Sequence, residues 1–156
     1  MALKGDRHVV VDDISYFMNE TATAGGVACI STVGSGIALD QSANVATYKA
    51  APSGCVPLGI LVNDVVNIDQ SKYHINFQKD EVQLGGKVTL VSDGWLVTNM
   101  IYPGTTPTAG QTAYLQHSGY ITPTSAGAAA TPAIGQFRST KDEDGYAKVY
   151  VKLPNF

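Results

Sequence analysis

The chain has 156 residues and a net charge of −3, with 44% hydrophobic and only 15% charged residues. This length suits one domain with its own core, and the charged share lies well below the roughly one quarter that is usual in globular proteins. The sequence has no block of Lys or Arg, which argues against nucleic-acid binding. It also has no apolar run that approaches the length of a membrane helix, about 18 residues, which argues against a membrane span.

The N-terminal residues are predicted to form an arm, residues 1–25, ahead of a single β domain, residues 26–156. Within the arm, Asp12–Glu20 fits either one short helix, with Asp12 or Asp13 as its cap, or an extended segment. The polar start of the chain lacks the apolar core of a signal peptide, so we expect a protein made in the cytoplasm. Cys29 and Cys55 are then expected to be reduced, with Cys29 buried in an apolar strand.

The remainder of the chain consists of short β-branched and aromatic runs separated by Gly and Pro. Runs at this spacing are typical of sandwiches and barrels. The predicted strands are Val27–Ser31, Val45–Tyr48, Pro57–Val62, Tyr73–Phe77, Lys87–Val91, Trp95–Ile101, Thr112–Leu115, Tyr120–Thr122, Ile134–Ser139 and Tyr146–Leu153. We therefore predict an all-β fold, a compact antiparallel β-barrel or β-tulip-like sandwich with at most one short helix.

Turn signals predict how some of these strands pair. The last strand alternates apolar and polar residues from Tyr146 to Leu153, as a half-buried strand does, and it follows the turn signal Asp142–Gly145. This pattern predicts a hairpin of the last two strands. Gly85-Gly86 and Asp93-Gly94 likewise predict a meander of Val82–Leu84, Lys87–Val91 and Trp95–Ile101.

Two segments rich in small residues, Tyr102–Gly110 and Pro123–Pro132, are predicted to be surface loops. The chain also contains a weak internal echo, because Gly26–Gly36 resembles Gly110–Gly119. Each stretch is a strand leading into a Ser-Gly turn, and each is followed by a short strand, a small-residue loop and a strand marked by Pro and Gly. An old duplication and a repeated use of the same hairpin pattern both explain this echo.

No residue pattern points to a reaction or a metal. His8, His74 and His117 are far apart, without a partner at metal-ligand spacing, and Gly34-Ser35-Gly36 lacks the strand-to-helix context of a nucleophile elbow. The acidic run Asp142–Asp144 lacks the further oxygen donors of a calcium loop. We expect no catalytic residue, no cofactor and no metal, and therefore a protein that is not an enzyme.

One resemblance covers residues 25 to 153. Its main stretch begins at Gly110-Gln-Thr-Ala-Tyr-Leu, continues through Ser118-Gly-Tyr-Ile-Thr-Pro-Thr, and ends with Pro132-Ala-Ile-Gly-Gln-Phe and the charged hairpin into Leu153. An earlier turn of the same pattern is Gly54-Cys-Val-Pro-Leu-Gly-Ile-Leu-Val-Asn-Asp64. In these features the chain resembles the small head decoration, or cement, proteins of tailed bacteriophages, although residues 1–26 depart from the pattern.

The resemblance implies a virion structural protein that binds the outer surface of the capsid and stabilises the head by bridging major capsid protein subunits. It also implies a homo-oligomer, with a trimer expected first and a dimer second. From their position ahead of the β domain, Arg7, His8, Tyr16, Phe17 and Met18 are predicted to contact the capsid. The alternatives are a tail-fibre or receptor-binding module, a carbohydrate-binding module, which Trp95 and the tyrosines would serve, and an enzyme of unknown class.

Overall fold

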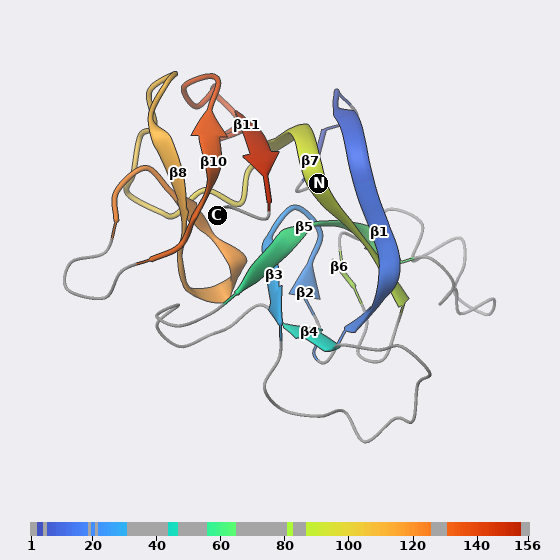
Figure 1. Cartoon of the computed structure of the whole chain (residues 1–156). Coiled ribbons are helices and arrows are strands. Elements are labelled where there is room, and N and C mark those ends of the chain that lie inside the picture. Colours follow the sequence, from blue (N-terminus) through green and yellow to red (C-terminus); the bar gives the residue numbers. More distant parts are fainter. Residues whose placement is uncertain are drawn as a thin grey trace.

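The computed structural model describes residues 3–4, 6–18, 20, 22–30, 44–46, 56–64, 81–82, 87–125 and 131–153. Regular structure in these ranges is β, apart from one 3-10 turn at His117–Gly119. The strands are β1 (His8–Met18), β2 (Ala22–Thr23), β3 (Val27–Ile30), β4 (Asn44–Ala46), β5 (Pro57–Asp64), β6 (Glu81–Val82), β7 (Lys87–Thr98), β8 (Thr112–Leu115), β9 (Ile121–Thr122), β10 (Ala133–Phe137) and β11 (Ala147–Lys152). The predicted all-β, compact barrel-like fold is confirmed (Figure 1).

The strands wrap into a ring. The main sheet has 9 strands in the order β1-β4-β3-β5-β7-β11-β10-β8-β9, and β1 pairs with β7 as well. That extra pairing closes a ring of β1, β4, β3, β5 and β7. At Phe17 and Met18, closure pairs main-chain groups that an open sheet would leave at its edge. The long strand β7 belongs both to this ring and to the second part of the sheet, β11, β10, β8 and β9. Its first half lies between β1 and β5, and its second half pairs with β11.

The second part of the sheet repeats the connections of the first. β8 pairs with β9 and β10, as β3 pairs with β4 and β5, and β10 then pairs with β11, as β5 pairs with β7. The parallel bridge between Ile101 and Ile121 also matches the parallel pairing of β1 with β4. The echo seen in the sequence is thus present in the topology, which supports the duplication.

Two glycines mark equivalent places in the two parts. A Cβ on Gly59 of β5 would lie 2.7 Å from the carbonyl oxygen of Val91 on β7, and a Cβ on Gly135 of β10 would collide with the carbonyl oxygen of Tyr150 on β11. In both cases the obstacle is the backbone of the next strand in the ring. Glycine is required here because the neighbouring strand approaches too closely for any side chain.

The structure decides between the two alternatives for Asp12–Glu20 and corrects the predicted turn at Asp93-Gly94. Asp12–Glu20 forms no helix, since most of it belongs to β1, so the extended alternative is the correct one. Asp93-Gly94 is no turn, since β7 runs through it; Gly94 has φ +142° and its missing side chain makes room for the carbonyl of His8. The predicted meander is therefore wrong as well, because the strands predicted to begin at Lys87 and at Trp95 are one strand, β7; of the first predicted strand, Val82–Leu84, only Val82 is described, and it pairs with Ala22.

The other predicted strands agree with the structure where it describes them. The final hairpin is confirmed, with β10 antiparallel to β11. Its turn is confirmed as well: the Gly145 amide donates to the Asp142 carbonyl at 3.0 Å, and Gly145 has φ +85°. Residues 102–110 form a loop as predicted. The predicted strand Tyr73–Phe77 and the residues Cys55, His74, 47–48, 83–86 and 126–130 lie outside the described residues.

One continuous core fills the barrel. Phe137 is the largest fully buried side chain among the described residues. The alternation predicted for the last strand is confirmed, because Ala147, Val149 and Val151 are all fully buried. Cys29 lies in this core, as predicted, and is 1% exposed. The buried hydroxyl of Thr98 is satisfied, since it donates to the carbonyl of Gly25 at 3.1 Å. The core is therefore a rigid support for the strands at the surface.

Candidate binding surfaces

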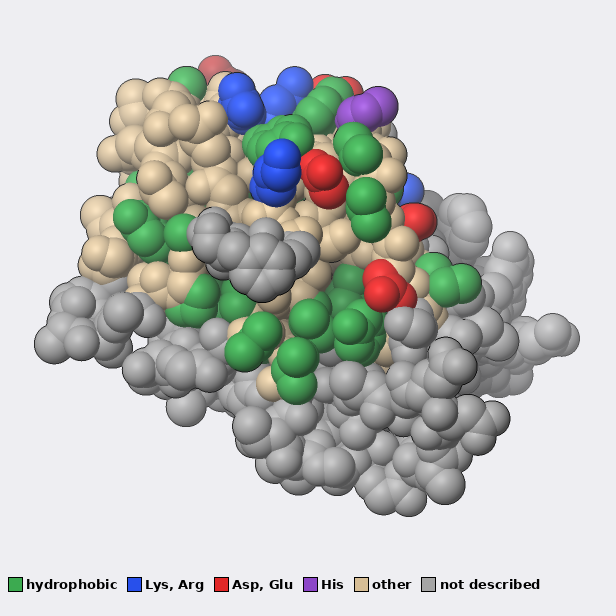
Figure 2. All heavy atoms as spheres, in the orientation of Figure 1, with side chains coloured by type: hydrophobic (Ala, Val, Ile, Leu, Met, Phe, Trp, Pro, Cys, Tyr) green, Lys and Arg blue, Asp and Glu red, His purple; other side chains and the backbone are tan. Residues whose placement is uncertain are grey.

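The first candidate surface is the outer side of β1. Val9, Val10, Val11 and Ile14 are exposed, Val10 by 57% and Ile14 by 50%. Hydrophobic side chains lie among acidic ones down the side of the molecule where β1 lies (Figures 1 and 2). An exposed aliphatic strand of this kind is typical of a surface that a partner covers. We call these four residues, together with Arg7, His8 and Asp12, the β1 surface.

The five residues predicted to contact the capsid do not share one environment. Arg7 and His8 are exposed, at the start of β1. Tyr16 is half-buried and packs against the core, and Phe17 is half-buried where β1 turns towards β4. Met18 is 1% exposed and belongs to the core, so it has no surface to offer a partner.

The aliphatic residues of the β1 surface were missed by reasoning from the sequence. The signal was present, because Val9-Val10-Val11 is a β-branched run, which favours a strand over a helix. The residues that follow also fit a short helix, because Ile14, Phe17 and Met18 have helical spacing. What the sequence could not show is that all three valines stay exposed. A register shift between Val9 and Val11, opposite Gly94 and Asp93 of β7, interrupts the usual alternation.

The second candidate surface is the outward side of β7, β10 and β11, where cations cover aromatic rings. The ammonium of Lys148 lies 3.9 Å from the ring centre of Trp95, and the guanidinium of Arg138 lies 5.2 Å from that of Tyr150. Trp95 and Tyr150 are opposite each other across the two strands. We call these four residues the cation–aromatic face. Because a cation already covers one side of each ring, neither ring is an open platform for a sugar on that side.

Asp93 ties the cation–aromatic face to the sheet. The hydroxyl of Tyr150 donates a hydrogen bond to Oδ1 of Asp93 at 3.0 Å. This hydrogen bond, with the nearby negative charge, raises the pKa of Tyr150. The phenol is therefore a fixed donor within the face, and Trp, Tyr and Arg are the residue types that most often dominate binding energy at protein interfaces.

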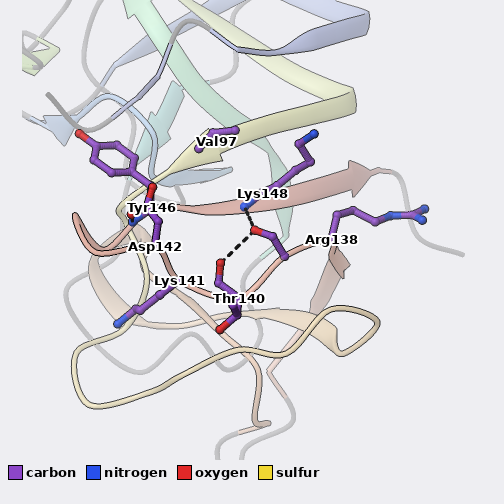
Figure 3. A pocket seen from close by; sticks show the side chains of 8 residues that line it. Val97, Arg138, Thr140, Lys141, Asp142, Tyr146 and Lys148 are labelled. Atoms are coloured by element: carbon purple, nitrogen blue, oxygen red, sulfur yellow. Dashed lines mark hydrogen bonds between the residues drawn. The ribbon is translucent and has the colours of Figure 1, made fainter.

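Beside this face lies a shallow depression around the β10–β11 turn, lined by Val97, Arg138, Ser139, Thr140, Lys141, Asp142, Tyr146 and Lys148. The hydroxyl of Ser139 donates to the carbonyl of Thr140 and accepts from the amide of Lys148. The charged ends of Arg138, Lys141 and Lys148 point away from one another (Figure 3). The depression thus brings no set of groups onto one point, as a reaction would require.

A salt bridge fastens the N-terminal segment to this turn. The ammonium of Lys4 lies 2.8 Å from Oδ2 of Asp142 and 4.6 Å from the ring centre of Tyr146. Oδ1 of Asp142 also accepts hydrogen bonds from the amides of Tyr146 and Asp144. The hydrogen bond from Lys4, followed by that from the Tyr146 amide, lowers the pKa of Asp142, and the same salt bridge raises the pKa of Lys4.

This salt bridge predicts a small acid-sensitive contribution to stability. A carboxyl whose pKa is lower in the folded state stabilises the fold above its unfolded pKa, and that contribution is lost as the pH falls through the folded pKa. We expect Lys4→Met to raise the pKa of Asp142 towards its usual range, measured by NMR titration of the carboxyl carbon. The difference in stability between Lys4→Met and the native chain should then vanish in acid. Lys141→Met is the control and should leave the pKa of Asp142 unchanged; equal shifts in both variants would contradict the pairing.

The other groups that the structure describes give no further site. His117 packs edge-on against Tyr102 and Tyr120, with ring centres 5.4 and 6.1 Å apart. Among the described residues, no three His, Cys, Asp or Glu side chains are grouped so that they could hold a metal ion. The same residues include no helix with the length and apolar character needed to cross a bilayer.

The comparisons with known proteins give no family for this chain. No protein-family model matches the sequence, and no curated protein matches it.

Proposed function

We propose that this protein is a decoration protein of a tailed-phage head, made in the host cytoplasm and bound to the outer capsid surface. It would stabilise the head by bridging major capsid protein subunits, without catalysis and without a cofactor. The observation that carries the proposal is the β1 surface, a strand held by the barrel whose aliphatic side chains remain exposed. The resemblance of residues 25–153 to head decoration proteins supports the same role.

The proposed protein stabilises the head by mechanical reinforcement of the shell. Packaged DNA pushes the shell outward, and a rigid block that bridges neighbouring capsid subunits adds contacts that expansion must break. Each contact needs only modest affinity, because a closed symmetric oligomer multiplies the effect of single contacts. In this proposal β1 lies at a junction between subunits, with Arg7 and His8 at its start, and the cation–aromatic face offers a second contact.

The test is binding to heads. The heads are taken from the phage that encodes this protein and are prepared without it. Purified protein mixed with these heads should cosediment with them until the binding sites on the heads are filled. Val10→Asp places a charge on the β1 surface and should weaken binding about tenfold or more. Val56→Asp is the matched control, since Val56 is 54% exposed at the start of β5 and should tolerate the change.

The outcomes separate the alternatives. No cosedimentation of the folded native protein would contradict a decoration role, and equal binding by both variants would contradict the role of β1. Gold-labelled antibody on native particles should decorate the head, whereas label on the tail would replace the proposal with a tail-fibre or receptor-binding module. Deletion of residues 1–18 is unsuitable as a test, because it removes Met18 from the core along with β1.

A further inference from the structure

The sequence around β1 has an order that is complementary to itself. It reads Arg7-His8-Val9-Val10-Val11-Asp12-Asp13, two basic residues, three valines and two acidic residues. If two copies run antiparallel about Val10, Val10 faces Val10, Val9 faces Val11, and each His8 faces an Asp12. Arg7 then faces Asp13 at both ends. A parallel arrangement would set like charges side by side, so the order favours the antiparallel one.

The structure leaves this stretch open to a second copy. Residues 7–12 are all exposed. Within the described part of the chain, Arg7, His8 and Asp12 take part in no ion pair, and away from β7 the strand pairs only with β4, at Phe17 and Met18. Val10 has no partner in the register between β1 and β7, because Val9 lies opposite Gly94 and Val11 lies opposite the adjacent residue, Asp93. The main chain at Val10 therefore has no ladder partner on β7.

We propose that β1 lies against β1 of a second copy of this chain, antiparallel, about a twofold axis at Val10. An interface on a twofold axis needs one surface that is complementary to itself, and the order of charges and valines around Val10 provides it. This inference takes from the proposed function only that β1 is a contact strand. It assigns the partner of residues 7–13 to a second copy, which leaves the cation–aromatic face as the contact with the shell. It favours a dimer, the second of the two oligomers expected, over the trimer.

The contact is short, and this determines how the dimer behaves. Seven strand residues extend over about 23 Å, so the strip is smaller than the area that stable dimers usually bury. The dimer should therefore form reversibly with rising protein concentration. Binding of both copies to one surface would then strengthen each contact by avidity.

Cross-linking tests the axis directly. Val10→Cys places two thiols opposite each other on the axis, within the range that a disulfide spans in an antiparallel pair. Mild oxidation should convert this variant to a covalent dimer on a non-reducing gel. Val56→Cys, similarly exposed but just before β5, and the native chain should remain monomeric under the same conditions. Equal cross-linking of Val10→Cys and Val56→Cys would overturn the inference.

Exchange of charges tests the register. His8→Asp sets carboxylate against carboxylate and should raise the dimer dissociation constant about tenfold in sedimentation velocity. The double variant His8→Asp/Asp12→His restores the pairing of a histidine with an aspartate and should recover most of the loss. A double variant as weak as the single one would overturn the register, and a native chain that stays monomeric would overturn the dimer.

The two proposals fail separately. A dimer that does not bind heads would leave this inference standing and overturn the decoration role. A chain that stays monomeric but loses head binding through Val10→Asp would overturn this inference and assign β1 to the shell.

Discussion

Replacing Gly135 by Ala should destabilise the protein by about 3 kcal/mol or more, one of the largest effects of any single added methyl group. The new Cβ would collide with the carbonyl oxygen of Tyr150 and lie 2.9 Å from the carbonyl carbon. These are backbone atoms of β11, so no side chain can move aside, and β10 and β11 must separate. Urea unfolding of the two proteins, compared by their midpoints and slopes, would measure the loss.

A matched control separates this collision from the general cost of removing a glycine. Gly104 lies in the loop after β7 with φ +82°, and a Cβ there would meet nothing within 4 Å. Gly104→Ala should cost only the strain of the left-handed backbone, about 1 kcal/mol. Gly59→Ala, at the equivalent place in the first ring, should resemble Gly135→Ala. If Gly135→Ala cost no more than Gly104→Ala, the close approach of β10 and β11 would be disproved.

Phe137→Ala should destabilise the protein by about 3 to 5 kcal/mol. Phe137 is fully buried at the end of β10 and is the largest of the fully buried side chains that the structure describes, so truncation removes its packing and leaves a cavity. Its backbone amide donates to the carbonyl of Gln111 at 2.8 Å, and its carbonyl accepts from the amide of Gly110. The mutation should therefore also loosen the loop before β8. Thermal and urea unfolding would measure the effect.

Val56→Ala provides the comparison for Phe137→Ala. Val56 is 54% exposed, so its truncation should change the free energy of unfolding by less than about 0.5 kcal/mol. A loss of under about 1 kcal/mol for Phe137→Ala would mean that the core repacks around the gap, contrary to the single rigid core described above.

Local patterns were sufficient for most strands. The alternation from Tyr146 to Leu153 predicted both β11 and its buried face, because successive side chains of a strand point to opposite sides. The Asp142–Gly145 turn was predicted for an equally local reason, since Asp142 bonds the backbone that follows it and Gly145 takes a positive φ. The echo between Gly26–Gly36 and Gly110–Gly119 was likewise visible in the sequence, because the order of turns and strands depends on residues close together in the chain.

Local sequence patterns could not predict the features that depend on contacts between segments far apart in the chain. Asp93-Gly94 has the composition of a turn, but Gly94 is needed because the carbonyl of His8 on β1 lies against β7 there. The position of β1 in the tertiary structure likewise decides that Met18 is buried while Val10 is exposed.

The sequence by itself determined the β class, most strands, the final hairpin and the order of charges around Val10, since each follows from side chains close together in the chain. Only the tertiary structure decided how the strands close into rings, why Gly59 and Gly135 must be glycine, and which residues of β1 face outward. These depend on contacts between strands far apart in sequence, where the approach of one backbone to another determines what space remains.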